Sequence, residues 1–546
     1  MTHKMILSLV LVFSFCAQGA FANGRDNIKI KPTRLEAPSL DEFAKEEKLL
    51  SSSGHSELPK RKPASGNKIV GSEDLMTAEL KAFRDKLVKT RHAEQLDALL
   101  REHNAKYDTL PNDLKYVVAR LSPLLAFRGF FWRMSSLAHQ AVVSQEVLLA
   151  GVRATAEQAM IFEPDTQWQA YMTFFAIPNA DLLKVPASKG DGVNRPDMKF
   201  YTENDLSDFF ATEVYSGLSI AVNRMAALRT TVDVNGKSTA IVFDNKIRFG
   251  ENAFNQAYDA VDRFSLIGDA EKYAVMARFH RRMATIAQMA AYNMNGNIAL
   301  RREIGKKYGV DAAISSILPG VDDAYDVDGL TRVERVTLAR SHRDLFRLRN
   351  GAWMKTAYGH FHQWAKYSAE GWKLVRNESR SYDTLLDPDL FAGRKEQIDK
   401  AVATSLRLFP NPAKDGSTTV VGAISGDELR VNTKDFFYNP PDDLKKMMPT
   451  QFNQHQDIEP LKAVYGASLK PSRKSQVEMK IEAGGHQQTV EWRNYLFGRA
   501  TGWDPAAYAR LFPGVNSPDD IARAQRILGE TRGARQLLTA LATVVK

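Results

Sequence analysis

The sequence has 546 residues, of which 44% are hydrophobic and 25% are charged, and its formal net charge at pH 7 is +10. A chain of this length can bury a core large enough to fold without disulfides, and its single cysteine is Cys16. The surplus of lysine and arginine favours anionic partners, although a generic basic surface accounts for the same composition.

Residues 1–22 have the pattern of a cleavable signal peptide: a basic start, an apolar run over 5–15 and small residues ending at Ala22. An apolar run of about eleven residues is half a membrane span, which favours cleavage over anchorage. A lipid-modified Cys16 is the alternative, and Phe15 before it argues against that reading. We therefore expect export to the periplasm, the outer envelope or the extracellular space. The mature chain then lacks cysteine, which excludes thiol catalysis and thiolate metal sites.

The predicted fold class is mainly α: a multi-helical chain with a small β-hairpin insertion and a C-terminal α+β portion. Residues 23–72 hold too few apolar groups to offset their ordering entropy, so they are expected to form a disordered leader or tether, with 40–50 as a transient helix. The further segments are a helical domain at 73–229, a β-hairpin insertion at 230–250, a second helical domain at 251–412 and an α+β domain at 413–546.

Apolar residues recurring every three or four positions predict the main helices, which are expected at 205–229, 269–295, 330–376 and 394–408. The helix at 269–295 has an apolar stripe that is typical of a core-facing side. Its other side carries Arg278, Arg281 and Arg282. The sequence therefore predicts one helix that is apolar on one side and basic on another.

Alternating polar and apolar residues predict the strands. The Asn235-Gly236 dipeptide indicates a hairpin or a three-stranded ribbon, and short strands are expected at 418–423 and 428–432. A further hairpin over 476–492 turns at Gly484-Gly485. That turn pairs Val477 with Trp492 and Met479 with Val490. The last helix is expected to start at 518, with Ser517 as its N-cap.

Motifs that carry a known chemistry are missing: the sequence has no HExxH, no Walker loop and no GxSxG elbow. No cofactor and no metal site are predicted. His360 and His362 are the one histidine cluster that can be considered for zinc or acid–base chemistry. On a helix they diverge by about 200°. Packed or surface histidines are therefore the favoured interpretation.

The segment 330–376 is predicted to form one or two helices, with Arg340, Arg343 and Arg347 on one helical face and aromatic residues after them. Such a surface can bind an anionic polymer by charge and stacking. The candidate binding residues are Arg340, Arg343, Arg347, Trp353, Trp364 and Trp372. Arginines that pair with acids of a neighbouring helix give the same pattern. Export makes nucleic acid an unexpected partner, so anionic envelope components or another envelope protein are favoured.

Three functional hypotheses follow. The first is an exported, non-enzymatic envelope binding or scaffold protein that uses basic helical surfaces. The second is a glycan or peptidoglycan hydrolase, for which Glu370, between Tyr367 and Trp372, is the candidate acid, because burial against rings keeps a carboxyl protonated. The third is a membrane-active effector with 127–132 as an aromatic wedge. No apolar stretch of the mature chain reaches eighteen uninterrupted residues, so at most peripheral membrane contact is expected.

Overall fold

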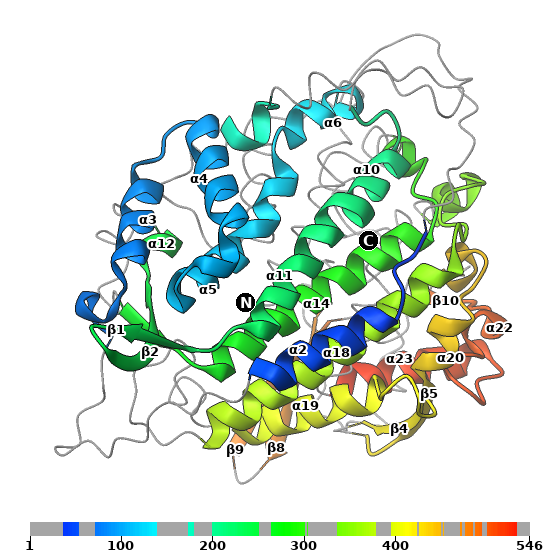
Figure 1. Cartoon of the computed structure of the whole chain (residues 1–546). Helices are drawn as coiled ribbons and strands as arrows, with labels where there is room; N and C mark the ends of the chain where they lie inside the picture. The colour runs from blue at the N-terminus through cyan, green and yellow to red at the C-terminus, as the bar shows by residue number, and fades with distance from the viewer. Residues whose placement is uncertain are drawn as a thin grey trace. The chain divides into compact units, whose positions relative to one another are not determined.

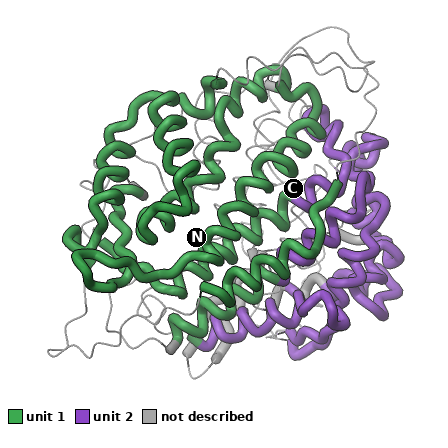
Figure 2. Tube along the Cα trace, in the orientation of Figure 1, with its two compact units in different colours: residues 1–286, 363–395 green, residues 287–362, 396–546 purple. Residues whose placement is uncertain are grey.

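The structure is a computed structural model that describes residues 36–53, 71–138, 173–179, 199–249, 264–300, 303, 336–377, 395–422, 425–448, 451–452, 470–471, 476–483, 486–493 and 500–531 (Figure 1). Contacts within the chain define two units (Figure 2). Unit 1 comprises residues 1–286 and 363–395, and unit 2 comprises residues 287–362 and 396–546. The boundaries of the two units fall inside two long helices and therefore differ from the domain boundaries predicted from the sequence.

The predicted mainly helical fold is confirmed. The helices of unit 1 are α2 (Asp41–Ser53), α3 (Ala78–Lys89), α4 (Ala93–Ala105), α5 (Asn112–Leu121), α6 (Phe130–Ala138), α10 (Glu203–Phe209), α11 (Tyr215–Ala227) and α12 (Lys246–Phe249). The divided helices are α14 (Asp269–Ala291) and α18 (Gly351–Asn377). Short 3₁₀ helices are η2 (Glu73–Leu75), η3 (Tyr107–Thr109) and η4 (Ser122–Phe127), and η5 (Phe210–Val214) is a π-helical turn.

The start of α3 is fixed by a buried aspartate. Thr77 is the N-cap of this helix, and its hydroxyl accepts a hydrogen bond from the Leu80 N–H at 3.2 Å. The carboxylate of Asp113, which is fully buried at the start of α5, accepts bonds of 2.9 Å from both the N–H and the hydroxyl of Thr77. Burial raises the pKa of Asp113, and the bonds from Thr77 act in the opposite direction. One carboxylate therefore joins the first turns of two helices.

A β-hairpin interrupts the helices of unit 1, as predicted, and a third strand outside the predicted 230–250 segment extends it to a three-stranded antiparallel sheet. Its strands β1 (Thr231–Val234), β2 (Lys237–Asp244) and β3 (Phe264–Ile267) lie in the order β1-β2-β3. Asn235 and Gly236 form the turn with φ values of 51° and 73°. Positive φ at both positions is what a two-residue type I′ hairpin requires, and asparagine and glycine tolerate it best.

Unit 2 has the mixed composition that was expected of the C-terminal part of the chain. Its remaining elements are α19 (Lys395–Leu408), β4 (Ser417–Val421), β5 (Glu428–Asn432), α20 (Thr433–Tyr438), η8 (Leu444–Met447), β6 (Gln451–Phe452), β7 (Lys470–Pro471), β8 (Gln476–Ala483), β9 (His486–Arg493), β10 (Ala500–Thr501), α22 (Pro505–Tyr508) and α23 (Pro518–Glu530). In its core Phe361 of α18 stacks on Phe409 with ring centroids 5.0 Å apart.

Two local predictions in unit 2 are confirmed at the level of single residues. Strands β8 and β9 pair in the expected register, with Val477 opposite Trp492 and Met479 opposite Val490. Ser517 caps α23, where its hydroxyl accepts a bond of 3.2 Å from the Asp520 N–H and the carboxylate of Asp520 accepts one of 3.0 Å from the Ser517 N–H. Both features depend on residues close in sequence.

The predicted disordered tether is wrong for residues 41–53, which form the helix α2. Glu46 and Ser53 of this helix are buried, so it is held by contacts with the rest of unit 1. Local composition missed these contacts because the partners of α2, on α11, α14 and α18, lie more than 150 residues away in sequence. The predicted signal peptide and its cleavage after Ala22 lie outside the described residues.

We predict that Asp113→Ala destabilises the protein by about 2–3 kcal/mol, because the mutation leaves the buried Thr77 groups without their acceptor. The free energy of unfolding in urea measures this change. Asp108→Ala is the matched control, since Asp108 is exposed and close in sequence, and it should stay within about 0.5 kcal/mol of the original protein. Equal effects of both substitutions would contradict the anchoring role.

We also predict a loss of stability at alkaline pH. Burial, with the charges of Asp269 and Glu370, raises the pKa of Tyr273 to about 12. A tyrosine in the unfolded chain has a pKa near 10. The contribution of Tyr273 to the free energy of unfolding is therefore complete below about pH 10 and is lost as the pH rises through the pKa of Tyr273 in the folded protein. Urea unfolding at stepped pH should show less of this loss for Tyr273→Phe. An identical loss in that variant would rule out Tyr273 as a source.

Candidate anion-binding site

Three arginines lie on one side of α14, as the sequence predicts. Arg278, Arg281 and Arg282 are separated by three and four positions, which places them as neighbours on the helix surface. Arg278 is exposed, while Arg281 and Arg282 are half-buried. The basic side of α14 therefore runs from solvent toward the interior of unit 1.

Arg120 of α5 adds a fourth guanidinium to this region. It is buried, and its Nη1 donates a hydrogen bond of 2.9 Å to the hydroxyl of Tyr116. Its Cζ lies 5.3 Å from the centre of the Tyr116 ring and 5.2 Å from that of Phe243 on β2. Two aromatic faces thus position Arg120, as cation–π contacts do when a charge leaves water. Arg120, Arg278, Arg281 and Arg282 are here called the arginine cluster.

The four charges of the arginine cluster act on one another. Burial lowers the pKa of Arg282 well below its usual range, and the charges of Arg278, Arg281 and Arg120 lower it further. Burial also lowers the pKa of Arg281. Arg120, Arg278 and Arg282 each take part in further interactions. The charge of the buried Glu271 acts on the pKa of Tyr116 together with the charges of Arg120 and Arg278, so an acidic side chain shares this region.

The chemistry of the arginine cluster is that of an anion receptor. A guanidinium is planar and presents N–H donors in a fork that matches carboxylate or phosphate oxygens. An anion placed beside several guanidiniums also reduces their mutual repulsion, which adds to the binding energy. Sequence reasoning identified the arginines of α14 and missed Arg120. The sequence feature that could have identified Arg120 is Tyr116, because residues four positions apart on a helix are neighbours and an aromatic ring can pack on a guanidinium.

The predicted helical face of Arg340, Arg343 and Arg347 is wrong. The helix that contains Arg340 ends at residue 341, and Arg343 and Arg347 lie in the following turns, where both are exposed. The buried Nζ of Lys445 binds three carbonyl oxygens of the segment that follows this helix, which holds the chain in its turn. These carbonyls belong to His342, Arg343 and Leu345, at 2.8, 2.9 and 2.6 Å.

Arg340 is likewise engaged inside unit 2, where its Nη2 donates a bond of 2.6 Å to the Met448 carbonyl. Burial lowers the pKa of Arg340. Trp353 and Trp364 of α18 are 1% and 7% exposed, so neither offers a ring for stacking against a polymer. Trp372 is half-buried. The six candidate residues therefore do not form one binding surface.

The histidine pair lies on the helix α18, which separates the two rings as expected. His360 is buried, and the Nδ1 of the half-buried His362 lies 3.0 Å from the Phe409 carbonyl oxygen. Positions two apart on a helix diverge by about 200°. In the part of the chain that the structure describes, no three His, Cys, Asp or Glu side chains are grouped as metal ligands.

Glu370, the candidate acid of the hydrolase hypothesis, lies on α18 with an exposed side chain. A carboxyl that must stay protonated near neutral pH needs to be buried against apolar surface. Tyr367, one of the two rings that suggested such a site, is itself fully buried in the core. The local sequence pattern around Glu370 therefore does not correspond to a buried acid.

The aromatic residues at 127–132 belong to the core of unit 1. Phe127 and Phe130 are 3% and 1% exposed, and Phe131 and Trp132 are half-buried. Ring centroids 5.2 to 6.2 Å apart link this segment to a larger cluster. The cluster consists of Phe127, Phe130, Phe131, Phe174, Phe175, Phe200, Phe209 and Phe210. Among the described helices, none has the length and apolar character that a membrane crossing needs.

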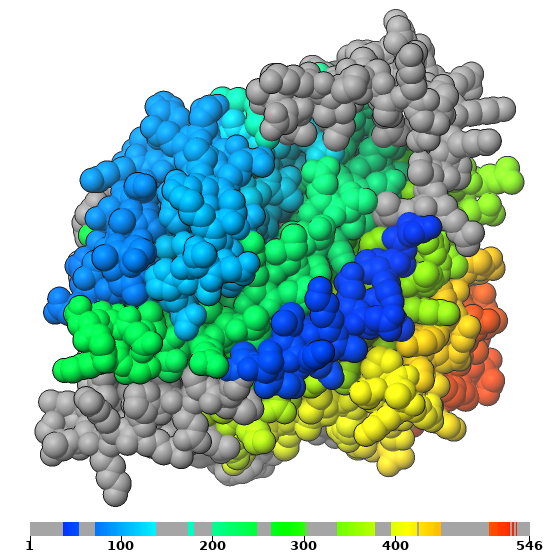
Figure 3. Space-filling model, viewed as in Figure 1, coloured from blue at the N-terminus to red at the C-terminus, as the bar shows by residue number. Residues whose placement is uncertain are grey.

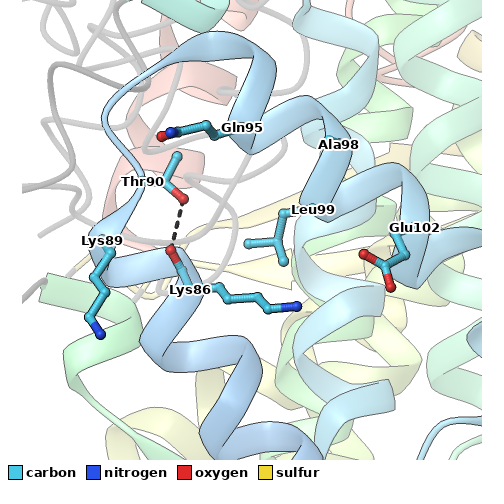
Figure 4. A pocket seen from close by; sticks show the side chains of 7 residues that line it. All are labelled: Lys86, Lys89, Thr90, Gln95, Ala98, Leu99 and Glu102. Carbon is cyan, nitrogen blue, oxygen red and sulfur yellow. Dashed lines mark hydrogen bonds between the residues drawn. The ribbon is translucent and has the colours of Figure 1, made fainter.

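A shallow groove of about 350 Å³ lies between α3 and α4 (Figure 4). Lys86 and Lys89 line it together with Glu102, so the charges at its wall are of both signs. The hydroxyl of Thr90 donates a bond of 2.9 Å to the Lys86 carbonyl, and Lys106 Nζ binds Glu102 Oε1 at 3.0 Å. The groove is therefore lined by charges of both signs.

We predict that Phe130→Ala destabilises the protein by about 3–5 kcal/mol, because it removes a fully buried ring from the aromatic cluster. Thermal or urea unfolding measures the loss. Trp132→Ala, at a half-buried neighbour, should cost clearly less. If Phe130→Ala instead left stability unchanged and abolished dye release from anionic vesicles, the segment would act as a membrane wedge and the packing role would be wrong.

Comparison with known proteins found no matching family model, no matching curated protein and no matching solved structure. The candidate site is therefore defined by the chain's own geometry. Its components are three arginines on one side of α14 and the buried Arg120 of α5.

Proposed function

We propose that this protein is an exported, non-enzymatic binding protein that holds anionic components of the cell envelope through the arginine cluster. The observation that supports the proposal is the arrangement of Arg278, Arg281 and Arg282 at spacings of three and four positions on α14, with Arg278 exposed to solvent. A site of this kind recognises phosphate or carboxylate groups and needs no catalytic side chain.

Positive charge would attract an anionic partner both at long range and in direct contact. The formal net charge of +10 attracts anionic surfaces over distances of about a Debye length, roughly 8–10 Å in physiological salt. The arginine cluster then supplies short-range contacts. Arg278 is exposed and meets the partner first, while the half-buried Arg281 and Arg282 bind more strongly because water screens them less.

Partners with several phosphates or carboxylates fit this arrangement best, since a row of guanidiniums along one helix can meet a row of anions. Anionic lipid headgroups and charged envelope polymers have that character. Export, expected from residues 1–22, would bring the chain to such partners. Another envelope protein with an acidic surface is the remaining possibility.

We predict that Arg278→Gln together with Arg281→Gln weakens binding to vesicles of phosphatidylglycerol and phosphatidylcholine about tenfold to a hundredfold at low salt. A hydrogen bond to a charged group contributes about 1.5–3 kcal/mol, and about 1.4 kcal/mol is tenfold in affinity. Sedimentation of the protein with vesicles over a salt series measures the effect. The double variant should also show a weaker salt dependence.

The matched control is Arg343→Gln together with Arg347→Gln, which removes the same charge from two exposed arginines of unit 2. Equal losses in the two double variants would mean that net charge alone drives binding and that the arginine cluster is not a site. Incubation with isolated cell-wall fractions, followed by mass spectrometry, tests the non-enzymatic part. Released glycan or peptide fragments would overturn it.

A further inference from the structure

Helix α2 is attached to unit 1 by buried polar side chains as well as by partly buried apolar ones, and the Phe43 ring lies 6.3 Å from that of His280. The helix packs against α11, and Figure 3 shows it as a dark-blue strip on the surface. Its two buried residues, Glu46 and Ser53, are both polar, whereas its apolar Phe43, Leu49 and Leu50 are only half-buried. A helix of a soluble protein usually buries an apolar stripe. The attachment of α2 therefore resembles ligand recognition more than core packing.

Glu46 inserts its carboxylate among aromatic and imidazole side chains. Its Oε1 lies 2.9 Å from the Nε2 of the buried His280 on α14. The His280 ring lies 5.4 Å from that of Tyr367 on α18, and Tyr273 stacks on Tyr367 at 5.8 Å. Burial, together with the charge of Glu46, raises the pKa of Tyr367. A carboxylate in this position thus meets a specific and enclosed set of partners.

Glu47, the next residue, binds α18 near the surface. Its Oε1 accepts a bond of 2.7 Å from Lys366 Nζ and one of 3.2 Å from Gln363 Nε2. At the end of α2, Ser53 Oγ lies 3.5 Å from the Nζ of the buried Lys272. Two adjacent glutamates and a serine seven residues after Glu46 are therefore recognised by groups from two helices.

This polar network is incomplete. Within the described part of the chain, the buried Oε1 of Gln363 has no hydrogen-bond partner. Burial lowers the pKa of Lys272, which means that its charge is costly there. A partly satisfied polar interface with little apolar burial is less stable than a packed core. We expect α2 to detach from unit 1 well before α11 or α14 unfolds.

We propose that α2 is a separable plug and that the surface beneath it is a receptor for an acidic helix of a partner protein. This receptor, formed by Lys272, His280, Gln363, Lys366 and Tyr367, is here called the α2 site. Its cationic and donor groups complement a helix with two adjacent glutamates. The pattern of α2 itself specifies the partner, with an apolar residue three positions before Glu46 and another three positions after Glu47.

The covalent connection makes α2 a strong competitor for its own site. A tethered ligand acts at an effective concentration in the millimolar range, so a free helix displaces it only when it binds more tightly or when α2 is weakened. The α2 site is distinct from the arginine cluster and does not depend on the function proposed for it. A variant that weakens α2 in place isolates the receptor for measurement.

The test uses the full chain carrying Glu46→Gln and Glu47→Gln, and a fluorescent peptide with the sequence of residues 36–53. We expect the peptide to bind this variant at least tenfold more tightly than the original chain, because the variant's own α2 has lost its charged hydrogen bonds. Fluorescence anisotropy measures the binding. A peptide with the same two substitutions should bind neither chain. Absence of peptide binding to the folded variant would overturn the proposal.

Lys45→Gln together with Lys48→Gln is the matched control, since both lysines of α2 are exposed and their loss should leave the peptide excluded. If the chain carrying Glu46→Gln and Glu47→Gln does not fold, hydrogen exchange of the original chain tests whether α2 detaches from unit 1. The backbone amides of α2 should then exchange at least a hundredfold faster than those of α14. Equal protection of both helices from exchange would contradict the proposal. A stable dimer in which α2 of one copy fills the site of another would overturn the assignment to a partner protein.

Discussion

Burial of arginine on aromatic rings is the interaction on which unit 1 depends. The Cζ of Arg133 lies 4.6 Å from the Phe200 ring and 4.5 Å from the Phe209 ring, and that of Arg224 lies 4.1 Å from the Tyr107 ring. The same arrangement recurs at Arg120 and Arg128. A ring face offsets part of the lost hydration of a guanidinium, and the apolar stem of arginine packs as well. The chain can thereby hold many cations among its phenylalanines without disulfides.

The same physics separates the two surfaces to which we assign binding. In the arginine cluster basic side chains of α14 and α5 are brought together, and we propose that they bind anions. At the α2 site the carboxylates of α2 already have partners, since Glu46 contacts His280 and Glu47 forms an ion pair with Lys366. We thus propose that one surface binds an anionic partner and that the other is occupied by a segment of the chain with the pattern of a partner helix. Both arise because α14 carries basic side chains on more than one side.

Sequence patterns predicted the structure well where the determining residues are neighbours in the chain. The register of β8 with β9 follows from alternation around Gly484-Gly485, and the start of α23 follows from Ser517. The same reasoning failed at Arg343 and Arg347. Lys445, about a hundred residues later, binds the carbonyls that stop the helix there, and periodicity carries no information about so distant a donor.

The sequence by itself determined the helical class, the places of the main helices and hairpins, and the basic side of α14, because each depends on periodicity and on capping or turn residues within one segment. Only the tertiary structure decided that Phe127, Phe130, Trp353 and Trp364 are core. It also decided that Arg120 lies near the arginines of α14 and that residues 41–53 are a docked helix. Whether a ring or a charge is exposed depends on which distant element covers it, and that contact is made in space and not along the chain.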